Sequence, residues 1–238
     1  METTPNIQEL AIVLAISNHN PTLLTPDFLA GSGIVPLNWE LSRPPVFSAQ
    51  ASQVAFTNGI SIVAQLGSVT FSESITNKPL EEVALASLAS KYASALPNLD
   101  YRAVGISPKR FVTFEHQPDA AHTFITNTLL SPGSWQNAGT ASLQANITLA
   151  YTFDQHQLRL NIAEARLQAA DKEPIPIILF AGSFHYDLDG ELGQARLTNL
   201  HKAIEHWRTD LETYQNLIDT QFLPLMETDQ ATMLKAVG

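Results

Sequence analysis

The chain has 238 residues, of which 45% are hydrophobic and 15% are charged, and its formal net charge is −10. This length allows one large domain or two small ones. The 13 basic and 23 acidic residues argue against a nucleic-acid partner, because affinity for nucleic acid depends largely on Lys and Arg neutralising phosphates. The sequence contains no cysteine, which excludes disulfides, thiolate metal sites and a cysteine nucleophile.

The N-terminal residues lack the features of a targeting segment. Residues 1–8 are polar and slightly acidic, and the apolar run that follows is too short for a signal peptide in that setting. Polar residues interrupt every apolar run of the first third of the chain well before about 18 residues. We therefore expect a cytoplasmic protein with no membrane span.

Charged side chains are scarce between Leu10 and Ser72. This stretch of 63 residues contains only Asp27, Glu40 and Arg43, whereas a typical soluble protein would have about sixteen charged residues there. Such scarcity indicates strands whose surfaces are mostly covered, either by the rest of the protein or by a partner.

The first half of the chain predicts a strand buried on both faces, several short strands and a helix. Leu10–Ser17 is a continuous apolar run of strand length. Asn58 and Gly59 form a strong hairpin signal, because both residues tolerate the positive φ of a type I′ turn. A helix capped by Asn77 ends before Pro97. The other predicted elements are strands at 37–42, 52–57, 60–65 and 69–73 and a helical turn at 26–30.

The second half predicts longer strands. A strand over 99–107 is interrupted by Pro108 and resumes at 111–115, and a helix over 118–130 follows. Strict alternation of apolar and polar residues predicts a hairpin over about 143–162. Beyond Ile162 the apolar residues change parity, so we place a β-bulge near Ala163. Residues 174–186 predict a further strand.

Near the C-terminus, apolar residues recur at spacings of three and four, which predicts a helix over Arg196–Phe222. Its length is about 40 Å at 1.5 Å per residue. Such a helix could pair with its copy in a dimer or lie across the protein's own sheet. Trp207 and Tyr214 pack poorly in a two-stranded coiled coil but suit a wide sheet surface. We therefore favour a helix lying across the sheet.

The order of predicted elements indicates an α+β fold, with antiparallel β-meanders packed against a few helices. The chain divides into an N-terminal half, 1–108, and a C-terminal half, 109–238. Each half has one meander and helices on one face, so two similar halves are one interpretation and a single compact domain is the other.

The densest group of potential metal ligands lies in the segment 182–191. His185 and Asp187 would point to one face if the strand continued, and Asp189 could add oxygen ligands for a hard cation. His185, Asp187 and Asp189 are therefore the candidate metal ligands. The alternative is a strand end followed by an acidic turn that caps the long helix. No motif for a nucleophile, a phosphate cradle or a zinc-binding helix has the required spacing, so we predict no catalytic residue and no cofactor.

The end of the chain combines a long antiparallel hairpin, a strand that closes in His185-Tyr186-Asp187-Leu188-Asp189, and a long amphipathic helix. In this it resembles the C-terminal part of a sporadically distributed bacterial family of uncharacterised proteins. The resemblance implies a fold and no catalytic activity.

These observations favour a non-enzymatic protein-binding or assembly module, a subunit of an oligomeric complex. The partner, another protein or a second copy, would bind through the charge-poor meander 10–72 or the hairpin 141–162. One alternative is a divergent metal-dependent hydrolase that uses His185, Asp187 and Asp189. Another is a small-ligand-binding barrel formed by the strands of the second half.

Overall fold

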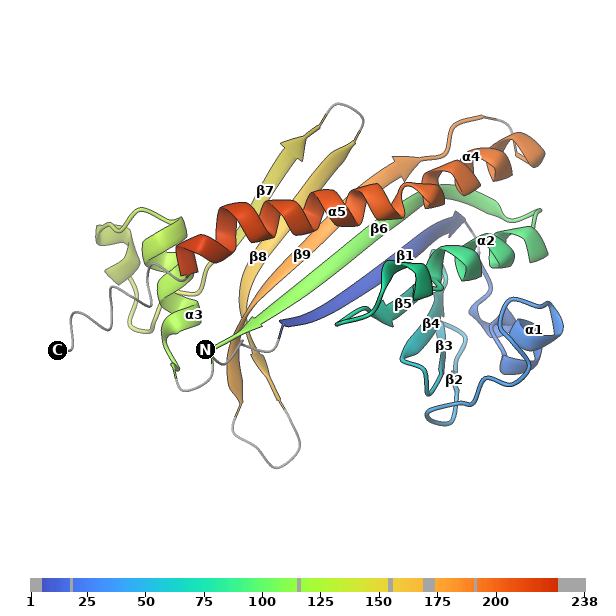
Figure 1. Ribbon diagram of the computed structural model, residues 1–238, viewed down its shortest axis with the longest axis horizontal. Helices are drawn as coiled ribbons and strands as arrows, with labels where there is room; N and C mark the ends of the chain where they lie inside the picture. The colour runs from blue at the N-terminus through green and yellow to red at the C-terminus, as the bar shows by residue number, and fades with distance from the viewer. Residues whose placement is uncertain are drawn as a thin grey trace.

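In the part of the chain that the structure describes, nine strands form one antiparallel sheet at the centre of the fold (Figure 1). The computed structural model describes residues 6–17, 19–114, 117–153, 156–168, 174–190 and 192–226. The strands are β1 (Asn6–Ser17), β2 (Val46–Phe47), β3 (Ala51–Ala55), β4 (Ile60–Gln65), β5 (Ser68–Ser74), β6 (Asp100–Thr113), β7 (Asn146–Thr152), β8 (Gln157–Leu167) and β9 (Ile175–Asp187). Their order across the sheet is β2-β3-β4-β5-β1-β6-β9-β8-β7.

Helices connect and flank these strands. The helices are α1 (Pro26–Gly31), α2 (Leu85–Ala95), α3 (Ala120–Thr123), α4 (Gln194–Glu205) and α5 (Trp207–Leu217). Short 3₁₀ turns lie at Pro21–Leu23, Leu80–Glu82 and Ser134–Asn137, and π-helical turns extend α3 over Phe124–Leu129 and α5 over Ile218–Phe222. The α+β fold and the long C-terminal helix are therefore confirmed.

The strand order is symmetric about the central pair. β1 and β6 lie side by side and antiparallel, and each pairs on its other side with the last strand of a meander, β5 or β9. Each half of the chain thus runs through a long strand, short helices, a meander and a longer helix. The boundary predicted at 108/109 falls inside β6, and the strands of both halves belong to one sheet.

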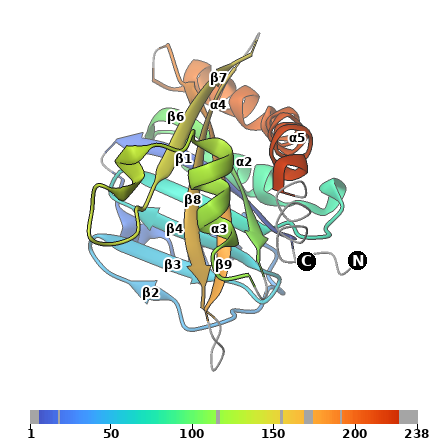
Figure 2. The same cartoon turned by 90° about the vertical axis from the view of Figure 1, so that its left-hand side faces the viewer.

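Helices cover one face of this sheet, which we call the covered face. Figure 1 shows α2, α4 and α5 in front of the strands, and Figure 2 shows α5 to the right of the strands. Large apolar residues of alternate strand positions are buried beneath them, among them Leu14, Phe71 and Phe184, each 0% exposed. The apolar seam of the C-terminal helix is also buried, including Trp207 and Tyr214. The prediction that this helix lies across the protein's own sheet is confirmed.

The closest approach of helix and sheet depends on one glycine. A Cβ atom on Gly182 of β9 would lie 2.8 Å from Cδ2 of Tyr214 on α5. The Tyr214 hydroxyl donates a hydrogen bond of 2.8 Å to the carbonyl oxygen of Phe180. A residue without a side chain therefore allows an aromatic ring to reach the backbone of the sheet.

Several local predictions are wrong. β6 runs through Pro108 without a break, since this proline lies within a continuous register with β1. β8 pairs with β9 in one register, so the bulge near Ala163 is absent; Ala163 simply faces the uncovered side. Residues 37–42 form only an isolated bridge, Leu41 to Phe56. The Asn58-Gly59 hairpin is confirmed, but only Gly59 has a positive φ, so the turn is not type I′.

Candidate functional site

The second face of the sheet has a different composition, and we call it the open face. The strand registers place on it small or uncharged side chains from six adjacent strands. Its central residues are Ala11, Val13, Ala15, Gln53, Ser61, Val63, Thr70, Ser72, Ala103, Gly105, Ser107, Ala181 and Ser183. Most of them are half-buried, since short side chains on a twisted sheet are shielded by their neighbours. No described helix lies over this face.

Charged side chains surround this uncharged centre. At one end Lys109 pairs with Glu9 at 3.0 Å. At the other end Arg102 pairs with Asp100 at 2.6 Å. These two pairs of opposite charges lie at the rim. The registers also place His185, Asp187 and Arg159 on this face, opposite Gly105, Ala103 and Ser183. The uncharged centre therefore lies over β3, β4, β5, β1 and β6, and β8 and β9 border it with charged residues. This distribution is typical of protein interfaces, which are depleted of charge in the core and polar at the rim.

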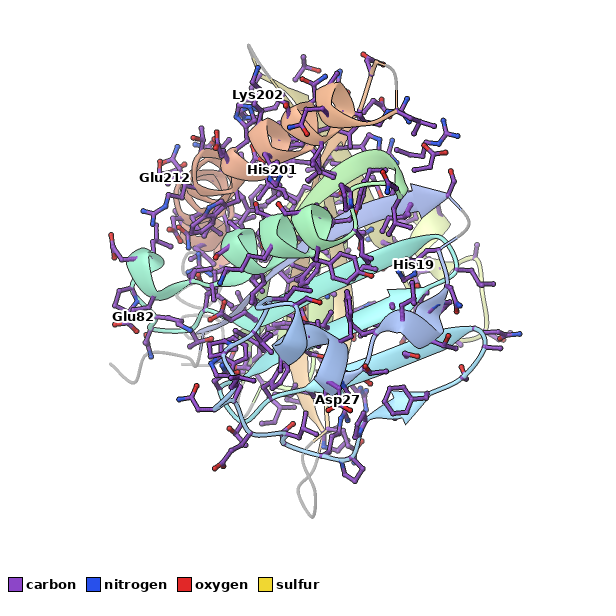
Figure 3. All side chains as sticks on the ribbon, turned by 90° about the vertical axis from the view of Figure 1, so that its right-hand side faces the viewer. His19, Asp27, Glu82, His201, Lys202 and Glu212 are labelled. Atoms are coloured by element: carbon purple, nitrogen blue, oxygen red, sulfur yellow. The ribbon has the colours of Figure 1, made fainter. Side chains whose placement is uncertain are left out.

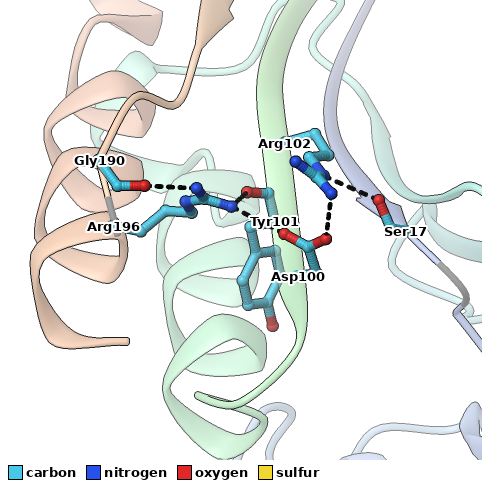
Figure 4. A network of polar contacts seen from close by, with 6 residues as sticks. All are labelled: Ser17, Asp100, Tyr101, Arg102, Gly190 and Arg196. Carbon is cyan, nitrogen blue, oxygen red and sulfur yellow. Dashed lines mark hydrogen bonds and ion pairs between the residues drawn. The ribbon is translucent and has the colours of Figure 1, made fainter. Parts of the chain in front are cut away.

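The rim near Asp100 is held by residues from three elements (Figure 4). Arg102 donates a hydrogen bond of 2.9 Å from Nε to the Ser17 hydroxyl on β1. Arg196 of α4 donates from Nη1 to the second carboxylate oxygen of Asp100 at 2.7 Å, and from Nη2 to the Gly190 carbonyl. Two arginines therefore fix one carboxylate and tie α4 to the ends of β1 and β6.

The other charged groups of the protein lie mainly on the helices and loops. Figure 3 shows Glu82, Lys202 and Glu212 on the helical side, and all three are exposed. Because the net charge of −10 is distributed over such positions, the open face is neutral in an acidic protein.

The structure brings together two of the three predicted metal ligands. His185 Nε2 lies 3.1 Å from Asp187 Oδ1, and these side chains are 62% and 80% exposed. Asp189 is exposed, and its backbone carbonyl accepts a hydrogen bond from Asn199 of α4. Within the described part of the chain, which leaves out Glu191, no group of three His, Cys, Asp or Glu could hold a metal ion. His185 and Asp187 lie opposite Gly105 and Ala103 in the register of β6 with β9, so this exposed hydrogen-bonded pair stands on the β9 side of the open face itself.

The helical histidine and glutamate do not form a site either. His201 and Glu205 lie on α4, and His206 follows at the junction with α5. The His206 ring stacks on Tyr186 at 5.2 Å between ring centroids. Nor do the described strands of the second half close into the barrel of the ligand-binding alternative, because β7 lies at the edge of an open sheet.

The sequence gives no signal for a buried polar cluster around Asp210, which is one of several charged residues along the last helix. Asp210 is 0% exposed, and both of its carboxylate oxygens accept the Tyr186 hydroxyl at 2.8 Å. His156 Nδ1 lies 3.9 Å from the same carboxylate. Burial raises the pKa of Asp210, although the hydrogen bond from Tyr186 opposes this. Burial, together with the carboxylate of Asp210, also raises the pKa of Tyr186. The cluster joins α5 to β9 and to His156, the residue before β8.

Histidine at position 19 is also structural. His19 is 1% exposed, and its Nε2 lies 2.8 Å from the Tyr92 hydroxyl oxygen. Burial lowers the pKa of His19, which favours the neutral ring. A lone histidine beside an apolar run gives no sequence signal that separates this role from a ligand role.

Comparison with known proteins gives no family. No protein-family model matches the chain, and no curated protein matches it. The resemblance of the C-terminal part to an uncharacterised bacterial family therefore remains a prediction. In the described part of the chain, no helix is both long enough and apolar enough to span a membrane.

Proposed function

We propose that this protein is a non-enzymatic protein-binding or assembly module that binds its partner on the open face. The observation that supports this proposal is the uncharged centre of that face, surrounded by paired charges, in a chain with a net charge of −10. A surface that is exposed to water throughout a protein's life usually contains charged residues, which cost nothing to hydrate. Scarcity of charge across five adjacent strands, β3, β4, β5, β1 and β6, indicates a surface that another protein covers.

The composition of the open face defines the chemistry of the partner. An unpaired charge pressed against Ala, Ser, Thr and Val side chains would lose its hydration without gaining a counter-ion. The partner surface is therefore uncharged at its centre, with small apolar and hydroxyl side chains. Its rim has charges that complement the Glu9–Lys109 and Asp100–Arg102 pairs. Of the two parts of the chain that were predicted to bind a partner, 10–72 contributes β1, β3, β4 and β5 to the centre of this face, whereas 141–162 forms β7 and the start of β8 beside it.

The test introduces charge at the centre of the open face. Thr70→Glu combined with Ser107→Glu places two carboxylates on β5 and β6, where neither side chain packs into the core. The affinity-tagged chain is expressed at native abundance in its source cell, and its assembly is analysed by native mass spectrometry. We expect the wild type to be isolated with a partner in fixed stoichiometry. The double variant should lose at least 90% of the bound partner, which corresponds to a loss of about 1.4 kcal/mol of binding free energy.

A matched control separates this effect from added negative charge alone. Ser87→Glu with Ser94→Glu makes the same kind of change on the exposed side of α2, and this variant should retain the partner. The proposal is overturned if the wild type is a monomer at high micromolar concentration and is isolated with nothing. It is also overturned if the open-face variant, folded by circular dichroism, retains the partner.

A further inference from the structure

The two edges of the sheet differ in how they are protected. Edge strands expose backbone groups that can pair with another chain, and proteins limit this with short strands, prolines or charges. β2 has only two residues and follows Arg43, Pro44 and Pro45. β7 has seven residues, Asn146–Thr152, with no charge, proline or glycine among them. It pairs with β8 on one side, and no described strand lies on its other side.

We propose that β7 pairs with β7 of a second copy of this chain, which makes a continuous antiparallel sheet across a two-fold axis. The sequence of β7, Asn-Ile-Thr-Leu-Ala-Tyr-Thr, is rich in residues that favour strands. Addition of a strand at an edge obtains affinity from main-chain hydrogen bonds and specificity from alternate side chains. A partner strand of any kind could supply the hydrogen bonds, so the side chains decide which partner fits.

The side chains of β7 are complementary to their own copy. Leu149 is the middle residue of the strand, so antiparallel pairing about Leu149 uses every residue of β7. On the covered side, this register places Ile147 opposite Tyr151 of the second copy and Leu149 opposite its own equivalent. These are the pairs of apolar and aromatic side chains that stabilise sheets. On the other side Thr148 faces Ala150, and both side chains are small and exposed.

The partial exposure of β7 side chains on the covered side also favours a second copy of the chain as the partner. α4 and α5 pack on β6 and α5 also contacts β9, and Ile147, Leu149 and Tyr151 are only partly buried. A second copy would bring its own partly buried Ile, Leu and Tyr against them and so extend the core across the axis. The absence of charge from β7 also matters, because two copies of a chain with a net charge of −10 repel each other at most other contacts.

This inference deepens the proposed function, because it names a second copy of the chain as one partner of the assembly. It rests on a different surface, the β7 edge rather than the open face. The charge variants at Thr70 and Ser107 should leave the β7 dimer intact, so each proposal can fail without the other.

The experiment compares two charge patterns on β7 by sedimentation velocity, with the full chain at about 1 to 100 µM. In Thr148→Lys with Ala150→Lys, introduced lysines lie directly opposite each other across the axis, twice in each dimer, and like charges in this position repel. In Thr148→Glu with Ala150→Lys, each introduced carboxylate faces an introduced ammonium group. We expect a dimer for the wild type, a dissociation constant at least tenfold higher for the first variant, and recovery to within threefold of wild type for the second.

A control at the opposite edge has the same change in charge. Val46→Lys with Gln50→Lys adds two lysines beside β2, where both positions are exposed, and should leave the dissociation constant unchanged. A wild type that is monomeric at 100 µM would overturn the proposal. So would two β7 variants with equal dissociation constants, because only this register distinguishes them. If the β2 variant dissociates the dimer and the β7 variants do not, the contact lies at the other edge and the proposal is wrong.

Discussion

The two faces of the sheet are both poor in charge, but for different reasons. On the covered face, Ile12, Leu14 and Phe71 are completely buried beneath helices. On the open face, the alternating residues of the same strands are Ala11, Val13 and Thr70, which are short and have no described helix above them. The first face lacks charge because it is core, where an unpaired charge would be very costly. The second lacks charge although water can reach it.

The difference between the two faces bears directly on the scarcity of charge between Leu10 and Ser72. Part of it follows from folding alone, because alternate residues of β1, β3, β4 and β5 enter the core. The residues of these strands that lie on the open face need a separate explanation, which in our proposal is a partner. Substitutions at equivalent positions on the two faces can therefore test whether the covered face is core and the open face is accessible.

The largest contrast is expected between neighbours on β1. Ile12→Ala removes a side chain that is 0% exposed and should lower the free energy of unfolding by about 2–5 kcal/mol. Val13→Ala removes methyl groups from the half-buried open face and should cost about 1 kcal/mol or less. Urea unfolding monitored by circular dichroism measures both. Equal losses would mean that the open face is buried within the monomer itself.

The next contrast is between adjacent cations on β6. Arg110 is 6% exposed on the covered side and pairs with Asp219 beyond α5, so Arg110→Met should cost about 1–3 kcal/mol. Lys109 pairs with Glu9 at the rim, where the two side chains are 39% and 35% exposed. Lys109→Met should therefore change stability by about 0.5 kcal/mol or less. Chemical denaturation at low and at 1 M salt would test this, since only the rim pair is readily screened.

Two glycines give the same substitution on opposite faces. A Cβ at Gly182 would lie 2.8 Å from Tyr214 and 3.0 Å from Pro108, so Gly182→Ala should cost about 1–3 kcal/mol by moving α5 away from the sheet. A Cβ at Gly105 would lie 3.5 Å from Val13 Cβ and 3.9 Å from the carbonyl oxygens of Val13 and Phe184, which are ordinary contacts. Gly105→Ala should be neutral or stabilising by up to about 1 kcal/mol. Thermal unfolding of both variants decides, and a large loss at Gly105 would contradict an open face.

The last contrast depends on pH. Burial raises the pKa of Asp210 in the folded protein. The folded state therefore retains the carboxyl proton to higher pH than the unfolded chain, in which this group has a pKa of about 4. The contribution of Asp210 to stability therefore decreases as pH rises from that value through the raised pKa. Asp210→Asn does not titrate, so the stability of the wild type relative to this variant should fall over that range. Denaturant unfolding of both proteins at several pH values measures this difference in stability. A difference that does not change with pH would mean that Asp210 is hydrated in the folded protein.

Much of the fold could be predicted from the sequence, because it follows from periodicity. The alternation from Leu143 to Phe153 predicted β7, and spacings of three and four predicted the helix that begins near Arg196. The break predicted at Pro108 is wrong, because β6 stays paired with β1 in one register on both sides of this proline. The change of apolar parity at Ala163 was interpreted as a bulge, but small alanines can also lie on an open face.

The candidate surfaces could be predicted only in part. Composition indicated charge-poor strands, but not which of their two faces a helix would cover. Pairing of β1 with β6 brings residues about a hundred positions apart into contact, as in Glu9 and Lys109, and no local pattern encodes this. In the sequence Asp210 is one of several charges along a helix. Its burial depends on Tyr186 of β9 and on His156, which precedes β8, and both are distant in the chain.

Hydroxyl-radical footprinting of the purified chain and of the assembly isolated from its source cell tests the central claim most directly, because it reports the exposure of each face separately. We predict that Val13 and Val63 on the open face react at least threefold more slowly in the assembly. Leu37, which is 87% exposed in a loop, should react at the same rate in both. If Val13 and Val63 react equally in both samples while exposed residues of α2 or α5 become protected, the partner binds over the helices and the proposed role of the open face is wrong.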